Sequence, residues 1–133
     1  MDGVTLTPLK IIKNPKGDIF QALKVSESEF NGFGEAYFSS VKKNVVKGWK
    51  KHTKMTLNLI VVVGEVKFVI YDSYNFFTIN LSKNNYQRLT ISPNLWLGFQ
   101  GIYDQNILLN LANIEHNPSE SLNEDISVFD YKW

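Results

Sequence analysis

The chain contains no cysteine among its 133 residues, and it has only two histidines, His52 and His116. Without cysteine there can be no disulfide framework, no thiolate metal site and no cysteine nucleophile. Two histidines also exclude a metal centre built on three histidines. These absences remove the commonest routes to a thiol enzyme or a zinc enzyme.

Long apolar runs and a strong net charge are absent as well. The longest strongly apolar run, residues 59–63, is far too short to span a membrane. The first residues, MDGVTLTPLK, lack the apolar core of a signal peptide. The formal net charge is only +1, so no overall field draws the protein to nucleic acid or to a membrane surface. We therefore expect a cytoplasmic protein that binds neither.

The charge that is present is distributed unevenly. Six of the 14 Lys and Arg residues fall in a short stretch: Lys42, Lys43, Lys47, Lys50, Lys51 and Lys54. Charge on an exposed strand edge would explain alternate lysines. The cluster is denser than that and adjoins a strongly apolar stretch, so we favour a patch that binds phosphate.

Apolar periodicity predicts a β-rich domain that spans residues 1–133. The length suits one domain with a single core. Val66, Phe68 and Ile70 alternate with polar or amphipathic neighbours, which is the pattern of a half-buried strand. The predicted strands are 4–12, 19–25, 35–41, 45–52, 55–63, 66–71, 76–81, 87–91, 96–99 and 107–112. Many short strands with frequent turns imply a sandwich, a jelly roll or a barrel.

Three local features refine this prediction. Gly64-Glu65 lies between two apolar strands and predicts the turn of a buried hairpin. Residues 26–30 are the only start of a helix, with Ser26 as the cap and Glu29 three residues later. A long polar break follows the first strand, which suggests that this strand pairs with another chain.

Three segments resemble short members of the RmlC-like cupins, in the same order and spacing: GEAYFSSVKKNVVKGWKKHTKMTLNLIVVVGEVKFVIYD, NYQRLTISPNLWLGFQGI and NLANIEHNPSE. Relatives of this kind are dTDP-4-dehydrorhamnose 3,5-epimerase and the dTDP-sugar 3,4-ketoisomerases. The resemblance implies an all-β cupin jelly roll, a double-stranded β-helix whose barrel binds a nucleotide-linked keto sugar. It also implies a homodimer, here through exchange or addition of strand 4–12.

The family chemistry needs a base beside a ketone, a cation or donor for the enolate, and an acid to return the proton. In such proteins the base is typically the His of an Arg-Gly-x-His segment, and the ketoisomerases carry a second His two residues on. Here the segment reads KGWKKH, residues 47–52, so Lys50 takes the base position and His52 the second one. In a strand, Lys50 and His52 share one face.

Lys50 leaves three interpretations open. Burial and neighbouring lysines could free its amine to act as a base. It could instead be the cation that stabilises the enolate, with His52 as the base. Catalysis could also be lost, so that the pocket only binds.

Other family positions differ too. The long epimerases place a catalytic Tyr where this chain offers His116, and they pair the base His with an Asp in a C-terminal stretch without a counterpart here. Tyr37 is a candidate for the acid, because related ketoisomerases use a tyrosine on the equivalent strand; a structural barrel tyrosine fits equally well. Glu120 and Asp125 are interpreted as surface acids.

The remaining family positions argue against a metal, and we expect no cofactor. Metal cupins supply two His and a Glu from one motif and a third His from another. Lys50 occupies the first of these places here, and Leu97 precedes Gly98 in the second motif. The candidate substrate-binding residues are Lys47, Lys54, Asn58, Trp96, Gln100, Asn110 and His116. Among them Trp96 is expected at the barrel mouth, while the amides could equally be structural.

The sequence thus supports two hypotheses. The first is an epimerase or isomerase that acts on an NDP-4-keto-6-deoxy sugar in surface polysaccharide biosynthesis, with His52 as the base, Lys50 as its cationic partner and Tyr37 as the acid. The second is a catalytically degenerate cupin that binds a sugar nucleotide or a partner enzyme.

Overall fold

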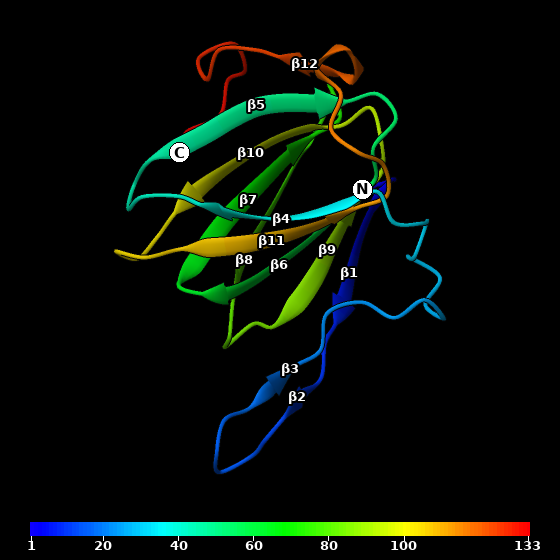
Figure 1. Ribbon diagram of the computed structural model, residues 1–133. Coiled ribbons are helices and arrows are strands. Elements are labelled where there is room, and N and C mark those ends of the chain that lie inside the picture. The colour runs from blue at the N-terminus through cyan, green and yellow to red at the C-terminus, as the bar shows by residue number, and fades with distance from the viewer.

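The computed structural model describes residues 1–133 and shows two five-stranded antiparallel sheets that face each other (Figure 1). The β4 sheet has the order β1 (Val4–Pro8), β9 (Gln87–Ile91), β6 (Leu57–Val63), β11 (Ile107–Ala112) and β4 (Glu35–Ser40). The β5 sheet has the order β12 (Ser121–Asn123), β5 (Val46–His52), β10 (Trp96–Gly101), β7 (Glu65–Tyr71) and β8 (Phe76–Ser82). The prediction of an all-β jelly roll is confirmed.

The core fills the space between the two sheets. Every second residue of β6 points into it, namely Leu57, Leu59 and Val61. The β7 residues Val66, Phe68 and Ile70 meet them from the other sheet. This alternation follows from the two-residue period of a strand. Each such side chain contributes about 1.5–3 kcal/mol through burial, so these two apolar faces hold the sheets together.

The segment around Gly64 does not form the predicted hairpin. β6 pairs with β9 and β11, whereas β7 pairs with β8 and β10. Gly64, with a φ of 74°, therefore carries the chain from one sheet to the other. The hairpin prediction is wrong because facing strands and paired strands show the same apolar alternation, and only their hydrogen-bond partners differ.

The N-terminal strands are shorter than predicted. The strand expected at 4–12 ends at Pro8, and β1 pairs with β9 of its own chain. After two further residues the chain forms a small two-stranded arm, β2 (Ile11–Ile12) and β3 (Ile19–Phe20), which projects from the body of the molecule (Figure 1). The strand expected at 19–25 is reduced to β3.

The helix predicted at residues 26–30 is also absent, since this segment forms only turns. Arg88 on β9 explains the difference. Its guanidinium donates to the Ala22 carbonyl and to the Glu27 carboxylate, both at 2.6 Å. Glu27 in turn accepts from the Lys24 backbone N–H at 2.9 Å. These tertiary hydrogen bonds hold the segment against the sheet in a non-helical path.

Candidate active site

A cavity of about 590 Å³ lies between the two sheets. One wall is formed by β4, β6 and β11, and the other by β5 and β10, with His116 and Asn123 beside them. Apolar side chains such as Leu59 and Phe99 alternate with polar ones around the lining. The polar lining residues are Glu35, Ser39, Lys47, Lys50, His52, His116 and Asn123, together with the phenol of Tyr37. This mixture is typical of a pocket that orients a polar ligand.

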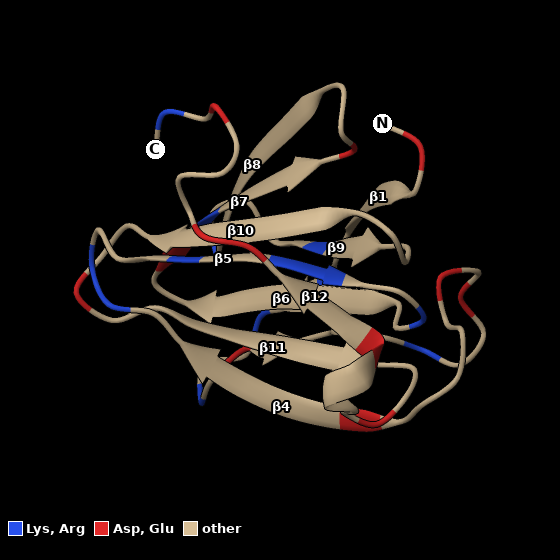
Figure 2. Ribbon diagram, turned by 90° about the horizontal axis from the view of Figure 1, so that it is seen from above, with Lys and Arg blue, Asp and Glu red and all other residues tan.

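His52 and Glu120 form a buried pair at this cavity. His52 ends β5 and is 9% exposed, and Glu120 is 6% exposed. The distance between His52 Nδ1 and Glu120 Oε1 is 2.7 Å. Glu120 reaches this position because η1 (Pro118–Glu120) leads directly into β12, which pairs with the end of β5. Figure 2 shows the basic stretch of β5 beside β12.

The Glu120 carboxylate is held ionised. Burial raises the pKa of this carboxyl, but hydrogen bonds from His52 and from the backbone N–H groups of Lys54 and Met55 outweigh burial and lower the pKa to about 2. An ionised carboxylate can only accept, so His52 Nδ1 carries the proton that joins them. The other ring nitrogen, Nε2, is then the one that can take a proton from a ligand in the cavity.

An extra residue in β5 changes which side chains face the cavity. Leu97 of β10 lies opposite Lys50, and Phe99 lies opposite Lys47. Moving three residues along β5 therefore corresponds to moving two residues along β10. Such a bulge re-aims the side chains on one side of it. Lys47, Lys50 and His52 consequently all line the cavity. The sequence-based expectation that Lys50 and His52 share the inner face is met.

Gly48 fits the bulge for a steric reason. Its φ is 154°, and a Cβ at this position would approach the Gly98 Cα to 2.8 Å. Trp49, next to it, packs on the outer face of the β5 sheet with Trp96 and with Phe129, Tyr131 and Trp133 of the C-terminal segment. The indole Nε1 of Trp49 also donates to the Ile126 carbonyl at 3.2 Å. The C-terminal segment therefore anchors the strand that carries the site.

The lysines differ in their surroundings. Lys47 Nζ donates to the Ser40 carbonyl at 2.6 Å and lies 3.4 Å from Ser39 Oγ, which links β5 to β4. Lys50 is half-buried, and its amine has no hydrogen bond or ion pair within the protein. An unpaired cation inside a cavity is suited to an anionic ligand or to charge that develops during a reaction.

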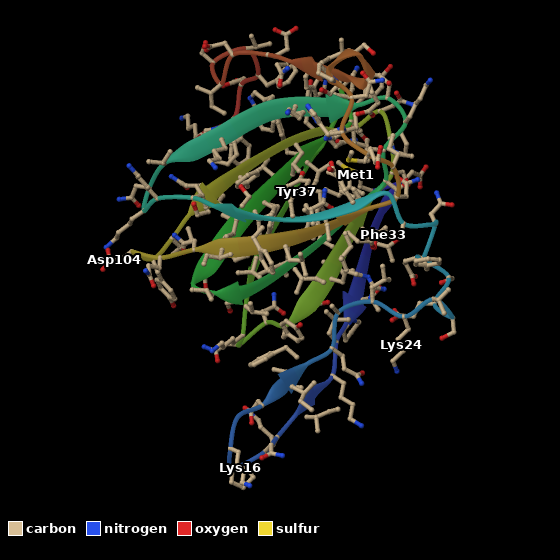
Figure 3. The ribbon with its side chains drawn as sticks, viewed as in Figure 1. Met1, Lys16, Lys24, Phe33, Tyr37 and Asp104 are labelled. Carbon is tan, nitrogen blue, oxygen red and sulfur yellow. The ribbon has the colours of Figure 1, made fainter.

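Tyr37 reaches the cavity from the opposite wall. It lies on β4 (Figure 3). Its partner in the strand register is Asn110 of β11. The Asn110 side-chain amide is 3.1 Å from the Tyr37 hydroxyl. Tyr37 is 40% exposed, whereas Asn110 is fully buried. The hydroxyl is thus within the reach of a ligand while the amide supports it from behind.

Five of the predicted site residues line the cavity, namely Tyr37, Lys47, Lys50, His52 and His116. Five others, Lys54, Asn58, Trp96, Gln100 and Asn110, do not line it, which corrects the sequence-based expectation. Trp96 packs in the outer aromatic cluster, and Gln100 donates to the Asn44 carbonyl. Asn58 alternates with the inward Leu57 and Leu59, so it points to the outer face and accepts from Thr90 Oγ1 at 2.7 Å.

Sequence reasoning missed the carboxylate of the pair. Glu120 was interpreted as a surface acid, but it is buried against His52. The local sequence gives no sign of this, because the contact depends on β12 pairing with a strand 68 residues away. Glu35, Ser39 and Asn123 were also missed as lining residues. For Glu35 and Ser39 the alternation with Tyr37 on the same strand was an available signal.

No group of three or more His, Asp or Glu side chains in the structure could hold a metal ion. We therefore interpret the site from its imidazole, amines, carboxylates and phenol.

None of the helical segments of the structure has the length and apolar character needed to cross a membrane.

A family model described as FdtA: WxcM-like, C-terminal matches residues 2–132. The chain belongs to this family. A solved dTDP sugar isomerase from Desulfovibrio desulfuricans G20 is 31% identical, with a TM-score of 0.92 over 96% of this chain and 87% of that chain. The resemblance to the RmlC-like cupins is thereby confirmed. Among proteins with curated functions, none matches.

Two more distant structures share the fold. The 3,4-ketoisomerase QdtA from Thermoanaerobacterium thermosaccharolyticum, in complex with TDP-4-keto-6-deoxyglucose, is 22% identical with a TM-score of 0.82, over 92% of this chain and 88% of that chain. The epimerase RmlC from Legionella pneumophila, in complex with dTDP-4-keto-L-rhamnose, is 17% identical with a TM-score of 0.84, over 96% and 75%.

Proposed function

We propose that this protein is a sugar-nucleotide isomerase that moves a proton next to the ketone of an NDP-4-keto-6-deoxy sugar. The observation that carries the proposal is the buried His52–Glu120 pair, which opens onto a cavity that also holds Lys47 and Lys50. The 31% identical dTDP sugar isomerase supports a nucleotide sugar as the substrate. By analogy with such enzymes, we also propose that the sugar serves surface polysaccharide biosynthesis.

In this proposal His52 Nε2 removes the proton from the carbon next to the ketone. The Glu120 carboxylate fixes the ring and stabilises the imidazolium that forms. The electron pair moves onto the ketone oxygen, where the Lys50 amine stabilises the negative charge. Lys47 holds the diphosphate at the edge of the cavity, where a cation meets a doubly charged ligand.

Tyr37 then takes part in the second half of the reaction. For 3,4-ketoisomerisation, Tyr37 gives its proton to the C4 oxygen and regains one from the C3 hydroxyl, while His52 returns its proton to C4. For epimerisation, Tyr37 gives a proton to the carbon from the face opposite His52. Solvent then returns a proton to Tyr37, and His52 releases to solvent the proton that it removed. Tyr37 and His52 lie on facing sheets, which is compatible with both.

The test is to incubate the protein with a TDP-4-keto-6-deoxy sugar in deuterium oxide and to follow the sugar protons by NMR. We expect loss of the signal at the carbon that is deprotonated, and a product with either a shifted ketone or an inverted centre. His52→Asn serves as the matched control and should exchange at least about 100-fold more slowly. Absence of both exchange and product with TDP-, UDP- and GDP-linked 4-keto sugars, from folded wild-type protein, would exclude the proposal.

A second candidate function is a binding protein without activity. The observation that favours it is Lys50, which lines the cavity at the position where related enzymes carry the first His. The substitution Lys50→His separates the two functions. A gain of exchange would indicate a degenerate enzyme, whereas loss from an active wild type would show that Lys50 is part of the machinery.

We also propose that the protein is a homodimer. The arm formed by β2 and β3 projects from the body, and Ile19 at its end is 55% exposed. On the outer face of the β4 sheet, Phe38 is 72% exposed, and the outer edge of β4 has no partner strand. A second copy would cover these apolar groups. Light scattering at two protein concentrations tests this, and a monomer at both would exclude it.

A further inference from the structure

The Tyr37 hydroxyl is paired with a single protein group, and the geometry of that group decides which way the hydroxyl proton points. Asn110 lies directly across from Tyr37 and is fully buried, so its amide has no access to solvent. Its nitrogen is 3.1 Å from the Tyr37 oxygen, and its oxygen is 3.1 Å from the Asn58 backbone nitrogen.

The Asn58 contact fixes the orientation of the Asn110 amide. A backbone N–H can only donate, so the Asn110 atom that faces it must be the oxygen. The amide nitrogen is then forced to face Tyr37, and because an NH₂ group can only donate, the Tyr37 oxygen has to accept. No other protein group hydrogen-bonds this hydroxyl, so its own proton is left to point into the cavity.

From this arrangement we propose that Asn110 is a positioning residue that sets Tyr37 as a proton donor to the bound ligand. When Tyr37 gives up its proton, the Asn110 N–H also stabilises the oxyanion that remains. This inference rests on the proposed function and deepens it. It assigns Asn110 a role that differs from the ligand contact expected from the sequence, because the amide does not line the cavity.

The most informative variant is Asn110→Asp. It keeps an oxygen for the Asn58 N–H but places a second oxygen against Tyr37. While ionised, that oxygen can only accept, so it draws the Tyr37 proton away from the cavity. We expect kcat to fall by about 10- to 100-fold with KM changed by less than about twofold. As the pH is lowered and the introduced carboxylate takes up a proton, it can donate again, so the ratio of variant to wild-type kcat should rise.

Two further variants isolate the role. In a Tyr37→Phe background, Asn110→Asp should cause no additional loss of kcat, since the two residues act as one unit. Thr90→Val is the matched control. It removes a buried hydrogen bond to Asn58 on the outer face of the same sheet. It should lower the melting temperature and leave kcat within about twofold.

A measurement without substrate tests the same contact independently of the proposed function. The ¹⁵N-labelled side-chain amide of Asn110 should show one proton signal that moves upfield on Tyr37→Phe, while its partner proton stays in place. The inference is overturned if neither amide proton moves. It is also overturned if Asn110→Asp raises KM with kcat unchanged. A loss of kcat in Asn110→Asp that is independent of pH and adds to the loss in Tyr37→Phe would overturn it too. Should wild-type protein show no deuterium exchange, the NMR comparison still decides whether Asn110 holds Tyr37.

Discussion

The molecule contains two buried pairs of a basic and an acidic side chain, and the two pairs differ in what the basic side chain contacts on its other side. His52 and Glu120 meet at 2.7 Å at the end of β5. Arg88 and Glu27 meet at 2.6 Å on the outer face of the β4 sheet, with Glu29 at 3.5 Å. The Arg88 side chain is fully buried and touches only protein. His52 touches protein with one ring nitrogen and the cavity with its other side.

This difference separates a structural pair from a chemical one. A guanidinium keeps its proton at any ordinary pH, and that of Arg88 is used to fasten the segment around Ala22 and Glu27. An imidazole can hold a proton on one ring nitrogen and take another on the second, so His52 can exchange a proton with a ligand. Burial and a short ion pair alone therefore do not indicate function. What indicates function is that the second ring nitrogen of His52 is open to the cavity.

The largest expected effect is on the chemical pair. Asn can place an N–H near the position of the imidazole Nδ1, so His52→Asn should keep the hydrogen bond to Glu120 and remove only the base. We expect the exchange rate to fall by about 10²- to 10⁴-fold, which is the usual contribution of general base catalysis. Deuterium exchange into the keto sugar measures it. A variant that keeps more than about a tenth of the rate would place the base elsewhere.

The structural pair should show the opposite behaviour. Arg88→Met removes the cation and leaves Glu27 and Glu29 without it, which costs about 3–5 kcal/mol for a buried pair. Because both glutamates keep some exposure, we expect the free energy of unfolding to fall by about 3 kcal/mol. Urea unfolding measures this. The rate per folded molecule should not change.

A triple variant serves as the control for Arg88. Replacing Glu27 and Glu29 by Gln in the Arg88→Met background removes the uncompensated charges, so part of the stability should return. If Arg88→Met instead abolished activity in protein that remains folded, the two pairs would not be as different as their geometry indicates.

The sequence predicted the inner face of β5 but neither of these pairs. Period-two alternation gave most strand positions and placed Lys50 and His52 on one face. The same alternation shows that Asn58 is opposite to Leu57 and Leu59, but only the other sheet decides which face is inner. Glu120 and Arg88 are paired with residues 68 and 61 positions away. Such contacts are set by which strands pair, and no local pattern encodes that.

Acid should weaken the Glu120 pair. The pKa of this carboxyl is about 2 in the folded protein, against an ordinary value near 4.5. Its contribution to stability is therefore present above pH of about 5 and is lost as the pH falls toward 2, with a total of about 3 kcal/mol. Glu120→Gln should flatten the stability curve over this range, as urea unfolding at several pH values would show. A curve of unchanged slope would mean that Glu120 does not gain this stabilisation on folding.

The smallest expected effect concerns two lysines. They differ, as His52 and Arg88 do, in whether the side chain contacts the cavity. Lys47 lines the cavity, whereas Lys54 is exposed and touches the pair only through its backbone N–H. Lys47→Ala should weaken TDP binding by about tenfold and reduce its dependence on salt, because one screened contact with the diphosphate is lost. Lys54→Ala, which removes the same charge from the adjacent loop, should change the affinity by less than about twofold. Calorimetric titration with TDP at low and high salt measures both. Equal losses in the two variants would mean that the lysine cluster attracts the ligand only through its summed charge, and that the cavity wall gives Lys47 no special place.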